Sequence, residues 1–130
     1  MSLNDPLANA LSLMINSERI ARNIAHVKPA SKMIKTVLEI IKTHGYIGDI
    51  KEIDDGRGKI LEVNLLGKIN KAGVIKPRFA LKKDEFEKYE KRYLPAKGFG
   101  ILIVSTNQGL LTHEEAKKNN LGGKLIAYCY

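Results

Sequence analysis

An apolar segment that stops abruptly at a polar one is the feature that most constrains this chain. Residues 100–104 read Gly-Ile-Leu-Ile-Val, and residues 105–109 read Ser-Thr-Asn-Gln-Gly. A short apolar run bounded by turn residues is typical of a buried strand, so we expect the polar residues to form a tip at its end. Thr112 and Glu115 then form the Thr-x-x-Glu pattern of a helix cap. The segment therefore predicts a tip held rigidly between a buried strand and a capped helix.

The tip offers hydrogen-bonding side chains that carry no charge. Hydroxyls and amides both donate and accept, so they suit sugar hydroxyls, phosphates and base edges. The same residue types are also common in ordinary turns, and a plain strand-to-helix loop is the alternative interpretation.

Helix and strand patterns alternate in the first part of the chain. Pro6 starts a helix that we expect to run to about Arg22, because apolar residues recur at helical spacing after it. The patterns then predict a strand over 24–28, a helix from Ser31 to Gly45, and two strands over 46–53 and 59–66 around a Gly-rich hairpin turn. In the strand over 59–66, apolar and polar residues alternate, which predicts one buried and one solvent-exposed face. These residues are Leu61, Val63 and Leu65 on one side and Glu62 and Asn64 on the other.

A boundary between two small domains is expected at Pro77, because residues 70–73 read as a turn and proline suits a sheet edge or linker. Asp84 with Glu87 then predicts the start of a helix, and residues 124–130 predict a strand that is apolar on both faces. We therefore expect an α+β fold. Residues 1–77 would pack helices on a short sheet, and residues 78–130 would form a mostly antiparallel sheet with one or two short helices and the polar tip.

The charge of the chain favours a polyanionic partner. There are 22 Lys and Arg residues against 14 Asp and Glu, which gives a net charge of +8 and a pI near 9.6. Ten of the basic residues but only four acidic ones lie between Lys68 and Lys97. Such a surplus is typical of proteins that bind nucleic acid or an anionic membrane surface. Helical ion pairs such as Glu87 with Lys91 would neutralise some of this positive charge. Only the cations without an acidic partner therefore indicate binding to a polyanion.

Several function classes find no support. No segment approaches the roughly 20 apolar residues of a membrane-spanning helix, and no secretory signal is visible, so we expect no membrane partner. A single cysteine, Cys129, suits a reducing cytoplasm. No two histidines have the spacing of metal ligands, and residues 67–73 lack the ending of a P-loop. We expect a cytoplasmic protein with no metal site and no cofactor.

Three further places could contact a ligand, and each has a structural alternative. Ser31 caps a helix. The free backbone N–H groups at the start of that helix, together with the neighbouring Lys32, also suit a phosphate. Gly122-Gly123 allows either a turn or a close approach to a ligand backbone. Tyr128 can stack on a base or ribose, although a tyrosine on an apolar strand is more often part of the core.

Two other classes of function are open at this point. His113 and Glu114 suggest a small RNA-processing enzyme, although His113 falls in the first turn of the expected helix. Tyr128 and Tyr130 on an exposed sheet edge would instead suit a protein-interaction subunit. We expect no enzymatic activity.

The residues taken together resemble the eighth protein of the small ribosomal subunit, in its archaeal and eukaryotic form. The resemblance spans almost the whole chain, and the matching stretches are residues 5–9, 29–32, 67 with 69–71, 73–79, 99–100, 113–116 and 122–124. It implies a protein that is a monomer when free and that binds the central domain of 16S ribosomal RNA early in assembly. It also implies a role in organising the platform, neighbouring ribosomal proteins as partners, and, from bacterial members, the protein's own messenger RNA as a further candidate partner.

The resemblance also assigns residues. The family's Ser-Thr loop falls on Ser105, Thr106, Asn107 and Gly109, and many relatives have serine where this chain has Asn107. Combined with the reasoning above, the expected RNA-binding residues are Ser31, Lys32, Ser105, Thr106, Asn107, Gln108, Gly109, Gly122, Gly123, Lys124 and Tyr128.

Overall fold

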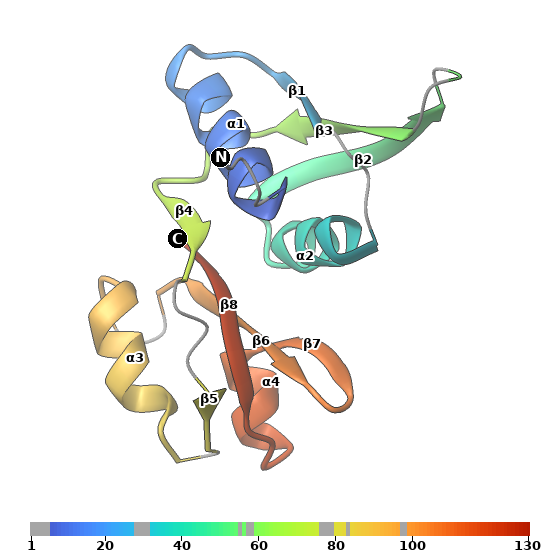
Figure 1. Ribbon diagram of the computed structural model, residues 1–130. Helices are drawn as coiled ribbons and strands as arrows, with labels where there is room; N and C mark the ends of the chain where they lie inside the picture. Colours follow the sequence, from blue (N-terminus) through green and yellow to red (C-terminus); the bar gives the residue numbers. More distant parts are fainter. Residues whose placement is uncertain are drawn as a thin grey trace. The chain divides into compact units, whose positions relative to one another are not determined.

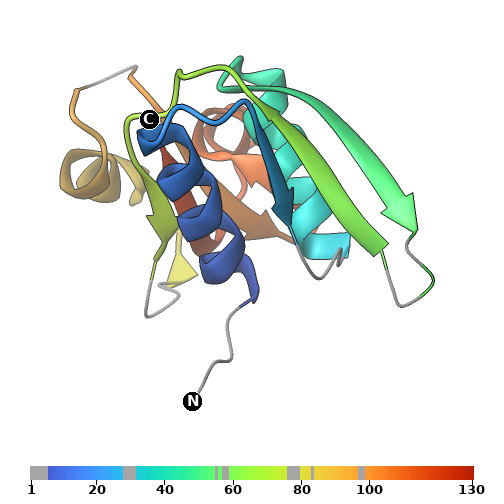
Figure 2. The ribbon, with the colours of Figure 1, turned by 90° about the horizontal axis from the view of Figure 1, so that it is seen from above.

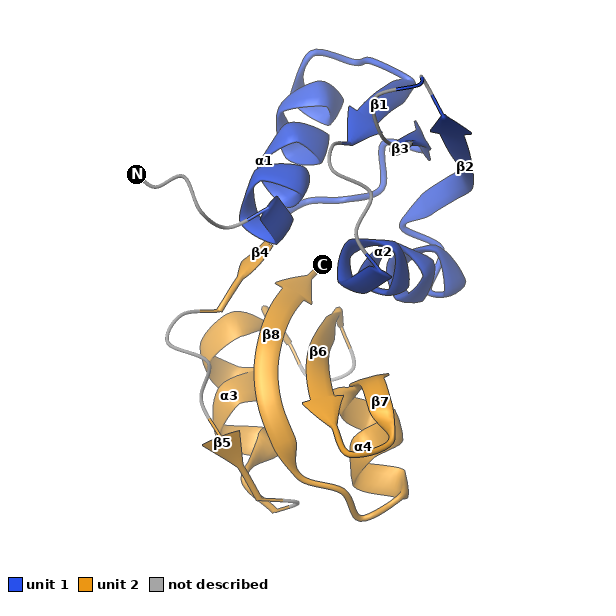
Figure 3. Cartoon of the chain, turned by 45° about the vertical axis from the view of Figure 1, so that its right-hand side comes forward, with its two compact units in different colours: residues 1–71 blue, residues 72–130 orange. Residues whose placement is uncertain are grey.

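The computed structural model describes residues 6–27, 32–54, 56, 59–75, 80–82, 84–96 and 99–130. The chain divides into two compact units, Met1–Lys71 and Ala72–Tyr130, which Figure 3 colours separately. The α+β class expected from the sequence is confirmed, because both units combine helices with antiparallel strands.

The first unit pairs helices with a short antiparallel sheet. Its elements are α1 (Pro6–Arg19), β1 (Ile24–Val27), α2 (Lys32–Thr43), β2 (Ile47–Asp54) and β3 (Lys59–Leu65). The described strands lie in the order β1-β3-β2, and Figures 1 and 2 show them side by side with β3 in the middle.

The core of this unit follows the sequence periods. In α2, residues at helical spacing are buried, namely Ile34, Val37, Leu38 and Ile41. In β3, Leu61, Val63 and Leu65 are buried while Asn64 is exposed, so the predicted alternation is confirmed.

Helix α1 ends at Arg19, earlier than the predicted Arg22. Ala21 has a φ of 58°, and its N–H donates to the Glu18 carbonyl (3.1 Å) while the Arg22 N–H donates to the Ser17 carbonyl (2.9 Å). These two bonds form a Schellman motif, which terminates a helix at a left-handed residue. Sequence reasoning missed it because alanine rather than glycine occupies the left-handed position.

The second unit is built on one antiparallel sheet. Its elements are β4 (Ala72–Val74), β5 (Ala80–Leu81), α3 (Phe86–Tyr93), β6 (Ile101–Thr106), β7 (Gly109–Thr112), α4 (His113–Lys118) and β8 (Gly123–Cys129). The strand order is β4-β8-β6-β7, and β5 also pairs with β8. Helix residues Phe86, Tyr89 and Ala116 pack in one core cluster with Leu102, Val104 and Leu125 of the sheet.

The division between the units lies between Lys71 and Ala72 rather than at Pro77. Ala72 pairs with Cys129 and Val74 with Ala127, so β4 belongs to the sheet of the second unit. Part of the segment predicted as a turn is therefore a strand. Pro77 itself lies outside the described residues.

The capping pattern predicted at Asp84 and Glu87 is wrong. Helix α3 begins at Phe86, and its N-cap residue is Glu85, which makes no side-chain cap bond. The Glu85 carboxylate instead accepts a hydrogen bond from the backbone N–H of Lys82 at 2.9 Å. The helix forms nevertheless because Phe86 and Tyr89 are buried on one of its faces.

Candidate nucleic-acid interface

The polar tip is the turn of a β-hairpin, not a loop that leads straight into a helix. Ser105 pairs with Leu110 and Thr106 with Gly109, which leaves Asn107 and Gln108 as the turn (Figure 1). Gly109 has a φ of 106°, a conformation that glycine adopts without steric cost. The expectation of a strand-to-helix loop is therefore wrong, because β7 intervenes between the tip and α4.

The hydroxyl of Thr106 holds this turn closed. It donates a hydrogen bond to the carbonyl of Gly109 at 2.8 Å and accepts one from the N–H of Gln108 at 3.1 Å. Both bonds are internal to the hairpin. Thr106 therefore shapes the tip.

Ser105 is placed differently from Thr106 because successive side chains of a strand point to opposite faces. Its hydroxyl forms no hydrogen bond with any described residue, and the Asn107 and Gln108 side chains are exposed. Ser105 is paired with Lys124 of β8, and cross-strand partners share a face. Lys124 is exposed and forms no ion pair within the described part of the chain. The tip thus presents three uncharged polar side chains beside a cation.

The double glycine brings the start of β8 close to its neighbours. A Cβ atom on Gly123 would lie 2.2 Å from the carbonyl oxygen of Ser105, and one on Gly122 would lie 2.4 Å from that of Leu81. Neither glycine is among the residues with positive φ, so they are not needed for a turn. The two glycines therefore allow a close approach of the chain's own backbone, which the sequence did not predict. Contact of these glycines with RNA stays a prediction.

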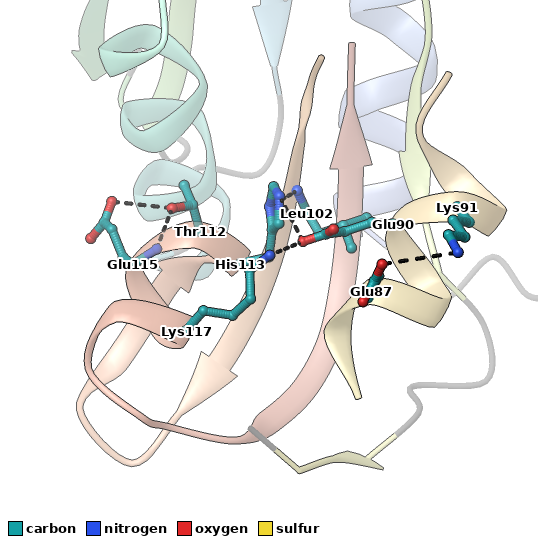
Figure 4. Close-up of polar contacts among 8 residues, drawn as sticks. All are labelled: Glu87, Glu90, Lys91, Leu102, Thr112, His113, Glu115 and Lys117. Atoms are coloured by element: carbon teal, nitrogen blue, oxygen red, sulfur yellow. Dashed lines mark hydrogen bonds and ion pairs between the residues drawn. The ribbon is translucent and has the colours of Figure 1, made fainter. Parts of the chain in front are cut away.

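The helix that follows the hairpin is capped as predicted. Thr112 Oγ1 accepts a hydrogen bond from the N–H of Glu115 at 3.3 Å, and Figure 4 shows the two side chains together. The cap anchors the end of β7, and so it anchors one side of the hairpin.

His113 lies in the core, where it joins three elements. Its side chain is 3% exposed. Its Nδ1 atom accepts a hydrogen bond from the N–H of Leu102 at 3.1 Å, and its Nε2 atom lies 3.3 Å from Oε1 of Glu90 (Figure 4). Lys117 binds the same Glu90 oxygen. Since Nδ1 accepts, the imidazole is neutral with its proton on Nε2, which donates to Glu90.

The electrostatics of this site agree with a neutral imidazole. Burial lowers the pKa of His113 below its ordinary value, and it outweighs the opposing effects of Glu90 and Glu114. A buried imidazole with both nitrogens engaged cannot reach an RNA substrate. The alternative of an RNA-processing enzyme using His113 is therefore contradicted, and the histidine instead ties α4 to β6 and α3. Sequence reasoning missed this role.

Tyr128 of β8 and Tyr130, just after the end of that strand, are part of an aromatic stack. The ring centroids of Tyr93 and Tyr128 are 5.5 Å apart, and those of Tyr128 and Tyr130 are 6.3 Å apart. The rings are partly buried against the core cluster, and β8 lies between β4 and β6. The alternative of a protein-binding surface on an exposed sheet edge is therefore wrong. Contact of Tyr128 with RNA stays a prediction.

The remaining expected residues lie in the first unit. Lys32 is the first residue of α2 and is exposed, whereas Ser31 lies outside the described residues. Among the residues that the structure describes, no cluster of His, Cys, Asp and Glu could hold a metal ion. Within the same residues, no helix is long and apolar enough to span a bilayer.

A comparison with protein families decides the identity. The family model for ribosomal protein S8 matches residues 5–130. The chain belongs to the ribosomal protein S8 family. Its members are structural proteins of the small ribosomal subunit that bind ribosomal RNA and contact other ribosomal proteins, and they are not enzymes. The archaeal and eukaryotic type within ribosomal protein S8 stays a prediction.

Proposed function

We propose that this protein binds the central domain of 16S ribosomal RNA early in subunit assembly and helps to organise the platform. The observation that carries the proposal is the β6–β7 hairpin. In a family that binds ribosomal RNA, its turn presents the side chains of Ser105, Asn107 and Gln108 with Lys124 beside them.

The side chains at the hairpin have different roles in RNA recognition. The Ser105 hydroxyl and the Asn107 and Gln108 amides hydrogen-bond to ribose hydroxyls and base edges in a wide minor groove or an unpaired internal loop. Thr106 keeps the turn in shape through its internal bonds. Lys124 and other exposed cations neutralise phosphates, which adds affinity without sequence preference.

Other expected RNA contacts lie outside the hairpin. Lys32, at the start of α2, contacts phosphates, and Ser31 is a further candidate for the same role. Gly123 and Tyr128 of β8, with Gly122 before them, lie next to the hairpin strand β6. A messenger RNA that presents the same shape would use the same hairpin, so the protein's own transcript is a candidate second ligand. In this proposal the free protein is a cytoplasmic monomer that joins neighbouring small-subunit proteins on the RNA.

Chemical footprinting on full small-subunit ribosomal RNA tests the proposal. Wild type is compared with Ser105→Ala and with Ser12→Ala, a matched control at an exposed position of α1. We expect protections in the central domain that Ser105→Ala weakens and Ser12→Ala leaves unchanged. Protections outside the central domain, or equal losses from Ser105→Ala on ribosomal and random RNA, would contradict the proposal.

A further inference from the structure

The sheet of the first unit has one face that stays open to solvent in the described part of the chain. On the opposite face, Leu61 and Val63 of β3 are fully buried, and Glu52 of β2 pairs with Lys35 of α2 at 3.0 Å. Since successive side chains of a strand point to opposite faces, the residues between these lie away from α2. We call this surface the outer sheet face, and its members are Ile24, His26, Asp49, Lys51, Ile53, Ile60, Glu62 and Asn64.

A groove of about 250 Å³ lies on the outer sheet face. Strand pairing brings its walls together, because Lys51 lies opposite Glu62 and Ile24 lies opposite Asn64. Pockets that hold whole cofactors or substrates usually measure about 300 to 1,000 Å³, so this groove is better matched to one side chain of a partner molecule. Its lining residues are Ile24, Asp49, Lys51, Glu62 and Asn64.

The two strands that form most of this groove are acidic in a strongly basic chain. Together β2 and β3 carry four acidic and two basic residues, whereas the whole chain has a net charge of +8. Asp49 lies 3.6 Å from Lys42, but its side chain is 82% exposed, so this ion pair neutralises it only weakly. Such a surface attracts cations rather than phosphates. The charged residues are Asp49, Glu52, Asp54 and Glu62 against Lys51 and Lys59.

One of the carboxylates in the groove is held in place. Oε1 of Glu62 lies 3.4 Å from Nε2 of His26, and the Glu62 side chain is only 26% exposed. A carboxylate that is already positioned loses less conformational entropy when it binds a cation.

Apolar side chains flank the charged centre of the outer sheet face. Ile24 and Ile53 are among the exposed large apolar residues, and Ile53 lies opposite Ile60. A protein partner can supply both apolar and charged side chains to such a surface, whereas an RNA backbone presents phosphates. The outer sheet face therefore suits a protein better than it suits RNA.

The charge of the strands also indicates which protein would bind. Proteins that bind ribosomal RNA carry a surplus of lysine and arginine, because these side chains neutralise phosphates. Two such proteins repel each other over most of their surfaces. A basic neighbour on the same RNA is therefore attracted to the acidic strands of this protein.

We propose that the outer sheet face docks a neighbouring protein of the small subunit through a segment that carries an arginine or a lysine. The cationic side chain enters the groove between Asp49 and Glu62, and apolar residues of the same segment cover Ile24 and Ile53. The inference rests on the proposed function, since RNA that binds both proteins raises their effective concentration for each other.

Photocrosslinking in reconstituted subunits identifies the partner. Benzoylphenylalanine replaces Ile53 in the full-length protein or, as a control, Ser12 at an exposed position of α1. Each protein is assembled with small-subunit ribosomal RNA and the total proteins of that subunit. We expect position 53 to crosslink to one small-subunit protein, at a segment that contains lysine or arginine. Crosslinks from position 53 to RNA alone, or no more protein crosslinks than from position 12, would overturn the proposal.

Charge changes with opposite expected signs then test the groove. The crosslinked protein is purified, and its binding to the complex of this protein with RNA is measured. Asp49→Asn/Glu62→Gln should weaken that binding about 10-fold, the scale of a lost hydrogen bond to a charged group. Lys51→Gln should strengthen it by about 2-fold, because it removes a like charge from the groove. Glu39→Gln/Asp84→Asn, which makes the same change of charge at two exposed positions, should match wild type.

The outcomes separate this inference from the proposed function. If Asp49→Asn/Glu62→Gln binds the partner as tightly as the control variant, or if Lys51→Gln weakens binding to RNA alone and leaves partner binding unchanged, the docking proposal fails. The hairpin proposal then still stands as long as Ser105→Ala loses central-domain protections. If wild type protects no nucleotides of the central domain, the proposed function fails, and the crosslink from position 53 still decides the docking proposal.

Discussion

The Nε2 atom of His113 lies 3.3 Å from Oε1 of Glu90, inside the core of the second unit. The pair links α4 to α3, and the bond from Leu102 to Nδ1 adds β6 to the same network. Since α4 follows the hairpin directly, this network supports the structure that presents Ser105.

The network predicts that stability falls in mild acid. Burial lowers the pKa of His113 in the folded protein, so the unfolded chain binds more protons below the ordinary histidine pKa of about 6.5. The stability from neutral His113 is therefore present above that pH and is lost as the pH falls through the folded-state pKa, by at most about 1.4 kcal/mol per pH unit. Glu90, Glu114 and Lys117 are the charged groups that face it.

Denaturant unfolding between pH 8 and pH 5 measures this effect. His113→Gln, which keeps a donor toward Glu90, should have a flatter profile than wild type. His26→Gln is the control because His26 is solvent-exposed. A wild-type slope in His113→Gln would show that the pH dependence arises elsewhere.

Ser105→Ala and Thr106→Val should separate recognition from hairpin stability. The Ser105 hydroxyl has no partner among the described residues, so its removal should leave unfolding within about 0.5 kcal/mol of wild type. It should reduce discrimination of cognate over random RNA by about 1 kcal/mol. Thr106→Val breaks two internal bonds and should destabilise the protein by about 1 kcal/mol or more. Equal effects of both variants on stability would argue against these different roles.

Gly123→Ala should disrupt the sheet beneath the hairpin. Its Cβ would lie 2.2 Å from the backbone oxygen of Ser105, so β8 and β6 must separate. We expect a loss of about 2 to 3 kcal/mol in unfolding free energy, with weaker RNA binding. Gly48→Ala is the control, because its Cβ would meet the flexible side chain of Asn64. A loss no larger than that of Gly48→Ala would mean that the strands adjust freely.

Ala21→Gly should stabilise the protein. The left-handed conformation costs alanine about 1 kcal/mol or more. Glycine removes this steric cost, but its unfolded chain has more conformational entropy to lose on folding, which offsets part of the gain. We expect a gain of about 0.5 kcal/mol. Ala10→Gly, inside α1, should instead lose about 1 kcal/mol. Thermal unfolding of both variants checks the opposite signs.

Patterns that extend over several helix or strand repeats could be predicted from the sequence. The alternation in β3, the buried face of α2 and the Thr112–Glu115 cap all follow from side-chain spacing, and all are confirmed. Helix and strand periods need several repeats, so β7 and β4, which span only Gly109–Thr112 and Ala72–Val74, left no signal.

The other features of the candidate site depend on contacts between elements, which the sequence does not show. The sequence places Ser105 and Thr106 together, but strand geometry turns them to opposite faces and commits one hydroxyl to the turn. The sequence allows the double glycine to form a turn or a close approach to a ligand, whereas the backbone oxygen that Gly123 approaches belongs to Ser105 of another strand. The sequence places His113 in the first turn of a helix, as observed, but only the approach of α3 places Glu90 beside it.

The most direct test of the central claim is a structure of this protein bound to a fragment of the central domain of small-subunit ribosomal RNA. The account predicts the Ser105 hydroxyl within hydrogen-bond distance of a nucleotide, with Asn107 and Gln108 at the RNA surface and the Thr106 bonds intact. A complex in which the hairpin turn faces solvent, away from every nucleotide, would contradict it.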